Sequence, residues 1–151
     1  MVLHNRKGYY MTKKENAAEL FHGGFNCAAS VLASFCEDYD LDTELALKLA
    51  CGLGGGFQSG EICGAVSAAI LVVGLKYGQY VMEDLAAKAN CRARASQIIE
   101  GFREKHGALT CRDLLGCDIT TVEGRETALE KKPFCAGLVG SAVELLEELG
   151  Y

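Results

Sequence analysis

Glycine residues divide this chain of 151 residues into pieces of helix length, and this division constrains the fold more than any other feature. Within the pieces the apolar residues recur with a helical period, as Ala28, Val31, Leu32 and Phe35 do. Few segments alternate between apolar and polar residues with the period of two that a strand requires. The pattern therefore predicts an all-α fold, a compact bundle of about six helices.

The predicted helices begin at capping residues and end at glycines. Thr12, for example, is followed three residues later by Glu15, which is the pattern of a capping box. The predicted helices cover residues 12–21, 26–40, 42–51, 59–75, 81–106 and 133–149, and a short capped turn begins at 110. The apolar stretch from Ile62 to Leu75 makes the fourth helix the central one, and it is shorter than the roughly 20 residues that cross a bilayer. We therefore do not expect a membrane-embedded protein.

The composition is that of one folded domain, which we place at residues 12–151 after a mobile leader over residues 1–11. Half of the residues are hydrophobic, so a chain of this length can bury a core without disulfides. The net charge is −5 and the basic residues are scattered, which argues against nucleic acid as a partner. The first residues lack the apolar core of a secretory signal, so we expect a cytoplasmic protein.

Eight cysteines are many for a reducing compartment, and they favour a reactive or metal-binding role over a disulfide framework. Four of them fall at predicted helix starts, and these are Cys27, Cys63, Cys111 and Cys135. A helix N-terminus presents unpaired N–H groups and a partial positive charge, which stabilise a thiolate. If the four meet in space, they form a site suited to a [2Fe–2S] cluster or to zinc. The alternative is that four helices merely begin with small residues.

The remaining cysteines point to other roles. Cys36 and Cys51 lie at predicted helix C-termini and Cys91 on an apolar helix face, so we predict that these three pack in the core. Cys117 is close to Cys111 in sequence and is the reserve ligand or a resolving thiol. The sequence has no Cys-x-x-Cys pair, which argues against a thioredoxin-type dithiol, and no Cys-x-x-Cys-His, which excludes c-type haem attachment.

The glycine run before Cys63 resembles a dinucleotide-binding loop only by letter count, because a helix precedes it and no strand with an acidic residue at its end follows. We expect the run to cap the preceding helix and to let backbone N–H groups approach the Cys63 site as a nest for an anion or a cluster. The glycines predicted to contact a cofactor are Gly54, Gly55, Gly56 and Gly64. We interpret His4 as a leader residue, and His22 and His106 as helix-end residues, rather than as metal ligands.

The stretch GLGGGFQSGEICGAVSAAILVVGLKYG resembles the signature of the C-GCAxxG-C-C family of redox-active proteins, small chains with four hallmark cysteines. The flanking segments FNCAASVL, CRDLLGCD and FCAGLVGSAVELL are similar to it too, so the resemblance covers roughly residues 15–149. The cysteines that match the hallmark four are Cys27, Cys63, Cys111 and Cys135. The sequence differs from the family signature at Ala68, which occupies the position of the last glycine in CGAxxG.

The family is similar to the non-haem part of split-Soret cytochrome c, and this resemblance implies a [2Fe–2S] centre here. Our leading hypothesis is electron transfer or redox sensing through a cluster held by the four matching cysteines, with a redox partner protein and a homodimeric assembly. One alternative is a thiol oxidoreductase with Cys63 as nucleophile and Cys111 or Cys117 resolving. The other is a zinc or soft-metal binding module.

Overall fold

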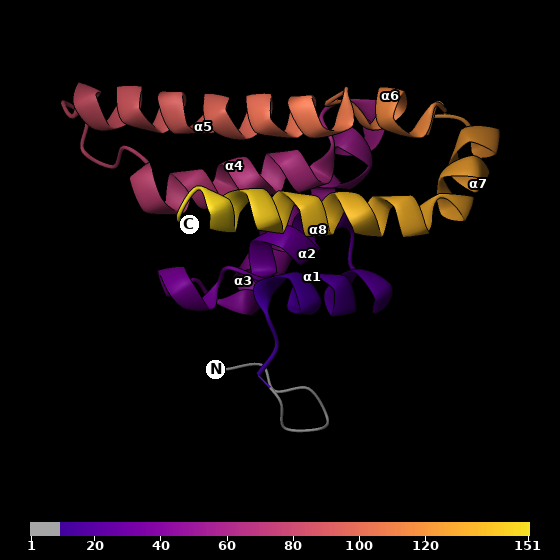
Figure 1. The fold of residues 1–151 in the computed structure, drawn as a ribbon, viewed down its shortest axis with the longest axis horizontal. Helices are drawn as coiled ribbons and strands as arrows, with labels where there is room; N and C mark the ends of the chain where they lie inside the picture. Colours follow the sequence, from indigo (N-terminus) through magenta and orange to yellow (C-terminus); the bar gives the residue numbers. More distant parts are fainter. Residues whose placement is uncertain (1–9) are drawn as a thin grey trace.

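The computed structural model describes residues 10–151, and within them the chain is built of α-helices joined by short turns (Figure 1). The helices are α1 (Lys13–His22), α2 (Cys27–Ala33), α3 (Thr43–Ala50), α4 (Gly64–Tyr77), α5 (Leu85–His106), α6 (Cys111–Leu115), α7 (Val122–Glu130) and α8 (Lys132–Glu148). The prediction of an all-α fold is confirmed. Most of the predicted leader, with His4, lies outside the described residues.

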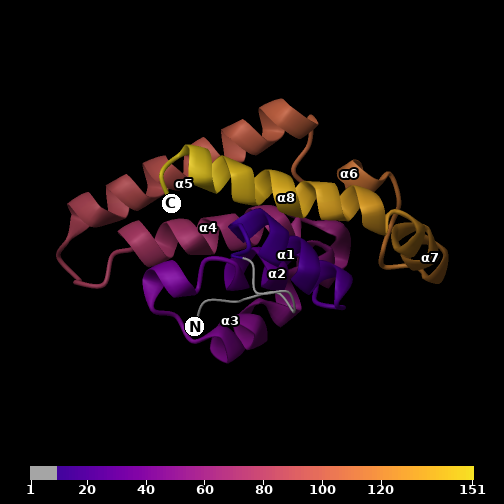
Figure 2. The same ribbon diagram turned by 60° about the horizontal axis from the view of Figure 1, so that its bottom comes forward.

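Helices α4, α5 and α8 run side by side along the long axis, and α1, α2 and α3 pack beneath them (Figure 1). Helix α2 contacts α1, α3, α4 and α8, so it is enclosed on nearly all sides. Its residues from Ala28 to Ala33 are all buried. Both ribbon views place α6 and α7 together at one end of the molecule, beside the start of α8 (Figures 1 and 2). The apolar fourth helix lies in the middle, as the sequence predicts.

The helix starts follow from the predicted capping residues. Thr12 and Glu15 form the reciprocal capping box at the start of α1. The Asn26 side chain accepts a hydrogen bond of 2.9 Å from the Ala29 N–H at the start of α2. Asp42 and Thr110 cap α3 and α6 in the same way. These caps fix the directions in which the chain enters α2 and α6, the helices that begin with Cys27 and Cys111.

Three predicted boundaries are wrong. Helix α5 begins at Leu85, after its N-cap Asp84, rather than near residue 81. Helix α2 ends at Ala33 rather than near residue 40, because a 3₁₀ turn follows and Asp40 adopts the left-handed conformation with φ of 50°. Helix α4 begins at Gly64 rather than near residue 59, because the chain from Gly55 to Gln58 is left-handed. Left-handed residues cannot continue a right-handed helix. Cys63 is therefore the N-cap of α4 rather than a first-turn residue.

Helix α7 is not among the predicted helices. The segment carries no apolar stripe, and Gly124 is its only buried residue. A signal was present, because Thr121 accepts from the Gly124 N–H as an N-cap and Glu123 lies in the first turn. An added Cβ on Gly124 would overlap the Asp118 carbonyl, so glycine is required there for packing.

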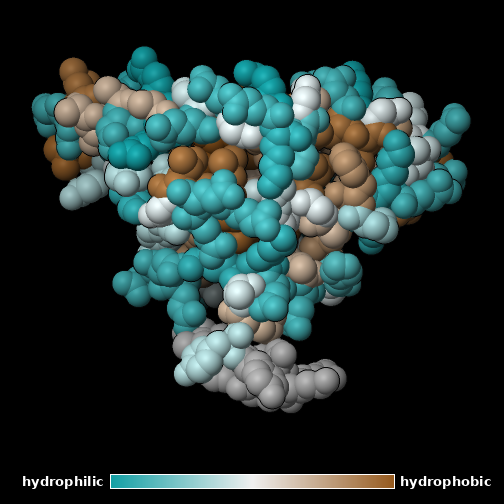
Figure 3. All heavy atoms as spheres, in the orientation of Figure 1, coloured by the Kyte–Doolittle hydropathy of each residue, from teal (hydrophilic) through white to brown (hydrophobic). Residues whose placement is uncertain are grey.

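The face of the bundle seen in Figure 3 is mostly polar, with apolar atoms showing in the gap between α5 and α8 and at the corner where α4 turns into α5. Exposed apolar side chains at that corner include Met82 and Leu85. Within residues 10–151, none of the helices combines the length and the apolar character needed to span a membrane.

Candidate functional site

A short backbone pairing joins the segment before α4 to the segment before α6. The Cys63 N–H donates to the Leu109 carbonyl over 2.8 Å, and the Cys111 N–H donates to the Glu61 carbonyl over 2.6 Å. Between these bonds Ile62 and Thr110 form an isolated antiparallel bridge. The pairing places the starts of α4 and α6 next to each other, although about fifty residues separate them in sequence.

The start of α2 touches the start of α4 through Gly64. A Cβ added at Gly64 would lie 2.7 Å from the Cys27 sulfur and 3.1 Å from the Leu53 carbonyl oxygen. A side chain of any size would therefore push Cys27 away from Cys63. The Cys-Gly step of the sequence is therefore a packing requirement of the sulfur site.

The glycine run forms a left-handed turn against the Cys27 end of α2. Gly55 and Gly56 have φ of 62° and 60°, and Phe57 and Gln58 follow with φ of 57° and 58°. Two non-glycine residues in this region cost about 1–3 kcal/mol each, so the rest of the fold must hold the turn in place. The turn directs the Gly55 N–H to the Cys27 sulfur. It therefore supplies one backbone donor of the predicted nest.

All four helix-start cysteines line one small closed cavity of about 20 Å³. The other residues that line it are Gly64, Leu114, Leu115 and Leu138. No carboxylate, imidazole or amine is among the lining side chains, so the only polarisable ligand atoms facing the cavity are sulfurs. The structure therefore brings together residues that lie as far apart in sequence as Cys27 and Cys135.

The Cys27 thiol is the most acidic of the four. Its pKa falls to about 6, chiefly because the Cys63 S–H donates a hydrogen bond to its thiolate. Burial opposes this shift, whereas the backbone N–H groups of Gly55 and Ala28 add to it. Cys27 is thus a thiolate at neutral pH, held by a neighbouring thiol and by helix-start donors.

The other three cysteines titrate in the opposite direction. The pKa of Cys63 rises because its proton is held in the hydrogen bond to Cys27 and because the side chain is buried. The pKa values of Cys111 and Cys135 rise to about 11, first through burial and then through the nearby charge of Cys27. The sequence predicts a thiolate at every helix start, but only Cys27 has a lowered pKa. At the other three cysteines the causes that raise the pKa, burial among them, exceed the effect of the helix dipole.

The donor set fits a thiophilic metal centre, whereas the cavity is narrow. All eight cysteines are free. No group of three or more His, Cys, Asp or Glu side chains within residues 10–151 has an arrangement that could hold a metal ion. A volume of 20 Å³ has room for about one water molecule. Four thiols with no competing hard ligand match a [2Fe–2S] cluster in type and number, but a cluster would need a wider cavity.

The remaining cysteines lie elsewhere. Cys36 is buried at the opposite end of α2 and donates its S–H to the Leu32 carbonyl, and Cys91 packs against the core from α5, as predicted. The prediction that Cys51 packs in the core is wrong, because Cys51 is exposed after α3. Cys117 does not line the cavity, and its S–H donates to the Gly124 carbonyl over 3.5 Å. It lies close enough to raise the pKa of Cys111 and Cys135 electrostatically. The two described histidines bond to Ala18 and Ser141.

A larger cavity of about 460 Å³ adjoins the small one and reaches Cys27, Cys111 and Cys135. Sequence reasoning missed the residues that build it, because they come from α1, the loop before α7, α7 and α8 and share no motif. Its other lining residues are Phe21, Gly24, Phe25, Asn26, Gly55, Gln58, Leu115, Ile119, Arg125, Ala128, Leu129 and Lys132. This cavity gives the buried sulfurs access to solvent.

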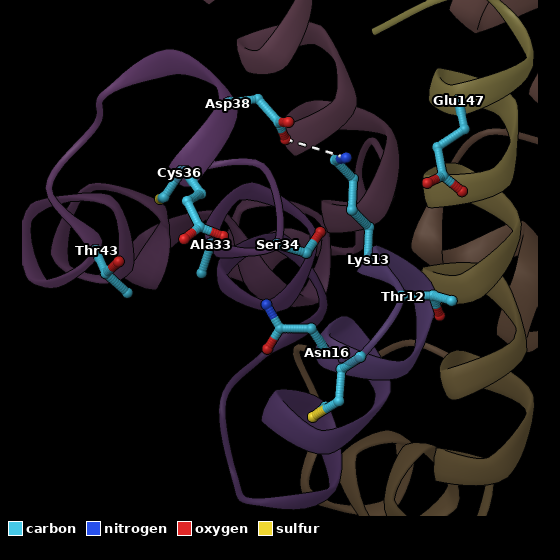
Figure 4. Close-up of a pocket in the computed structure, with 11 residues that line it drawn as sticks. Thr12, Lys13, Asn16, Ala33, Ser34, Cys36, Asp38, Thr43 and Glu147 are labelled. Atoms are coloured by element: carbon cyan, nitrogen blue, oxygen red, sulfur yellow. Dashed lines mark ion pairs between the residues drawn. The ribbon is translucent and has the colours of Figure 1, made fainter. Parts of the chain in front are cut away.

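A third cavity, of about 280 Å³, lies at the other end of α2 and is shown in Figure 4. Lys13 and Asp38 form an ion pair of 3.2 Å at its edge, and Ser34 and Thr43 lie nearby. Its one cysteine, Cys36, has a pKa raised by burial. The cavity therefore has no reactive thiolate, and it takes no part in the cysteine site.

The comparisons with known proteins agree with the cysteine geometry. The family model described as "Putative redox-active protein (C_GCAxxG_C_C)" matches residues 25–149, which include all four cavity cysteines. The chain therefore belongs to the C_GCAxxG_C_C family. No curated protein and no solved structure matches the chain.

Proposed function

From its membership of the C_GCAxxG_C_C family and from the geometry of its cysteines, we propose that this protein transfers electrons or senses redox state through a [2Fe–2S] cluster. The ligands would be the thiolates of Cys27, Cys63, Cys111 and Cys135. The observation that carries the proposal is that four separate helix starts deliver four thiols to one apolar cavity. A dithiol needs only two such positions, whereas a [2Fe–2S] cluster takes four. When bound, the cluster supplies one-electron transfer.

The surrounding residues have distinct tasks in this proposal. Cys27 is already ionised at neutral pH and is the first thiolate available to a metal. The backbone N–H groups of Gly55 and Ala28 donate to its sulfur, and such bonds tune the reduction potential of a cluster. Leu114, Leu115 and Leu138 exclude water from the sulfurs. The glycines of the run approach the sulfurs closely, as a cofactor nest requires.

The experiment is anaerobic purification or reconstitution with iron and sulfide, followed by visible absorption and by iron and acid-labile sulfide analysis. We expect a brown protein with equal amounts of iron and sulfide. Cys63→Ser supplies a hard, poorly ionised oxygen and should abolish or destabilise the cluster while helix content is kept. Cys91→Ser is the matched control, because Cys91 lies outside the cavity. Colourless protein that binds zinc instead would reject the cluster.

A second candidate function is thiol–disulfide exchange, and the hydrogen bond between Cys63 and Cys27 favours it. The Cys27 thiolate would attack the disulfide of an oxidised substrate, forming a mixed disulfide and releasing one substrate thiolate. Deprotonated Cys63 would then attack the Cys27 sulfur and release the second thiol. The chain would end with a Cys27–Cys63 disulfide, and the substrate would have gained two electrons. The nucleophile here is Cys27 rather than the predicted Cys63, because Cys27 has the lower pKa.

Equilibration of metal-free protein in glutathione redox buffers tests this second function. Peptide mapping should find a Cys27–Cys63 disulfide that forms and breaks reversibly within the range of cellular potentials. Cys63→Ala should instead trap a glutathione adduct on Cys27, because no resolving thiol remains. A stable Cys111–Cys135 disulfide with Cys27 left reduced would contradict the assignment.

The homodimer, the cytoplasmic location and the protein partner remain predictions. The dimer is supported by Leu71 and Leu75 of α4, which are 40% and 39% exposed, and by the apolar atoms between α5 and α8 (Figure 3). The location is supported by eight unpaired cysteines, which suit a reducing compartment. Analytical ultracentrifugation of the wild type and of Leu75→Lys tests the dimer, and a monomeric wild type would reject it.

A further inference from the structure

The cavity of about 460 Å³ beside the cysteine site is of the size that small-molecule sites have, roughly 300–1,000 Å³. It touches three of the four cysteines, Cys27, Cys111 and Cys135, from the solvent side. A molecule in it would therefore lie against the redox-active sulfurs. Its volume suits a compact molecule.

The lining of this cavity is apolar and aromatic on most sides. Phe21 and Phe25 contribute rings, and Leu115, Ile119 and Leu129 contribute aliphatic surface. Aromatic side chains favour flat ring systems, which they contact edge-to-face or by offset stacking. The polar amide of Gln58 does not add charge. The body of a fitting ligand is thus apolar and preferably aromatic.

The charge of the cavity is opposite to that of the chain. Its lining includes Arg125 and Lys132 but no Asp or Glu, whereas the whole chain has a net charge of −5. The Arg125 guanidinium donates to the carbonyls of Ile119 and Thr120 over 3.4 and 3.2 Å, which fixes its position at the rim. Within residues 10–151 the Lys132 ammonium has no ion pair or hydrogen bond of its own. The Cys27 thiolate also lines the cavity, but the two cations outnumber this one anion, so the lining stays net positive and favours an anion.

We propose that this cavity binds a small aromatic anion, of one or two rings with a carboxylate, sulfonate or phosphate, directly against the sulfurs of the cysteine site. Binding of the anion is inferred from the cavity alone, whereas any redox role of the bound anion rests on the proposed function. The redox partner protein expected from the sequence stays a separate prediction.

The test uses the full chain and two probes that differ in charge, 2-naphthoate and 2-naphthalenemethanol, with binding measured by ligand-observed NMR and calorimetry. Wild type should bind the anion more tightly than the alcohol. Lys132→Gln should weaken naphthoate binding by about threefold to fivefold and leave the alcohol unchanged, as expected for one partly solvated charge pair. Adding Arg125→Gln should remove the remaining preference. Leu129→Ala should weaken both probes.

The matched control is Lys88→Gln with Arg92→Gln, which makes the same change in net charge on the exposed face of α5. The proposal is overturned if both probes bind equally to wild type, or if this control weakens naphthoate as much as the cavity variants do. Absence of binding by either probe also overturns it. The single Lys132→Gln variant keeps the test valid if Arg125→Gln disturbs the loop that Arg125 bonds to.

The test of anion binding and the test of the redox function can fail independently of each other. Protein that binds naphthoate as expected but holds neither a cluster nor a reversible disulfide would keep the binding site and reject the redox function. Protein that holds a cluster but does not bind the anion would reject only the cavity proposal.

Discussion

The two halves of the cysteine site are built in different ways. Cys27 and Cys63 stand at the starts of α2 and α4, which pack tightly on each other in the centre of the core. Cys111 stands at the start of α6, a helix of five residues, and is followed by α7, which buries only Gly124. We call these the core half, α2 with α4, and the arm, residues 111–130. Contacts within the core half stabilise the Cys27 thiolate, whereas the arm covers the cysteine site.

The difference in packing between the core half and the arm indicates which side of the cysteine site can move outward. At Gly64 the contact with Cys27 leaves no free space, so the core half cannot spread without disturbing the core. The arm is held by fewer bonds, chiefly the Cys111 N–H to Glu61 and the Lys131 ammonium to the Leu115 carbonyl. Elements with few buried contacts open at low free energy. Entry of a cluster or a ligand should therefore displace the arm.

The largest effect is expected from Gly64→Ala. Its Cβ would lie 2.7 Å from the Cys27 sulfur, so the substitution overpacks the core half and should lower the free energy of unfolding by about 1–3 kcal/mol. It should also raise the pKa of Cys27 by separating it from Cys63. The control is Gly74→Ala in the same helix, where a Cβ meets nothing within 4 Å. That change should be stabilising by up to about 1 kcal/mol in urea denaturation, because alanine favours helix.

The arm should respond locally rather than globally to Gly124→Ala. The added Cβ would overlap the Asp118 carbonyl, and the shift should break the bond from Cys117 to the Gly124 carbonyl. We expect faster amide hydrogen exchange over residues 111–130, with exchange in α2 and α4 unchanged. Gly137→Ala, at an open position of α8, is the control. Equal acceleration in α4 would show that arm and core half unfold as one unit.

Thiol reactivity distinguishes Cys27 of the core half from Cys111 of the arm and from Cys135 of α8. In reduced, metal-free protein the rate of alkylation of Cys27 by iodoacetamide should rise with pH through a midpoint near 6, because its thiolate is stabilised. Cys111 and Cys135 should react only at strongly alkaline pH, because their pKa values are near 11. Cys63→Ala removes the S–H donor and should move the Cys27 midpoint upward. Cys51→Ser should leave it in place, since Cys51 is exposed and does not line the cavity.

The sequence was sufficient to place the helix starts at Cys27 and Cys111, and insufficient for the glycine turn and for the charge states of the four thiols. Asn26 and Thr110 show as caps, and the cysteines that follow them are placed by local chemistry that a sequence displays. The left-handed turn at Phe57 and Gln58 was not foreseeable, because its strain is held by tertiary contacts rather than by residue preference. The inequality of the four thiols also depends on burial and on which sulfur donates, which only the assembled structure determines.

The smallest effect concerns His106 at the C-terminal end of α5, where acid should weaken the core. His106 Nε2 lies 2.7 Å from the Ser141 hydroxyl, and its ring packs on Phe102. Burial, with a smaller contribution from Lys105, lowers the pKa of His106 below its usual value of 6.5. The unfolded chain then binds the proton more readily than the folded one, so stability should fall as pH drops through 6.5 and level off below the folded pKa. The ring is only partly buried, so we expect a loss of less than about 1 kcal/mol. Urea denaturation between pH 7.5 and about 5 should show this slope in wild type and not in His106→Gln, whereas an equal slope in both would assign it to other groups.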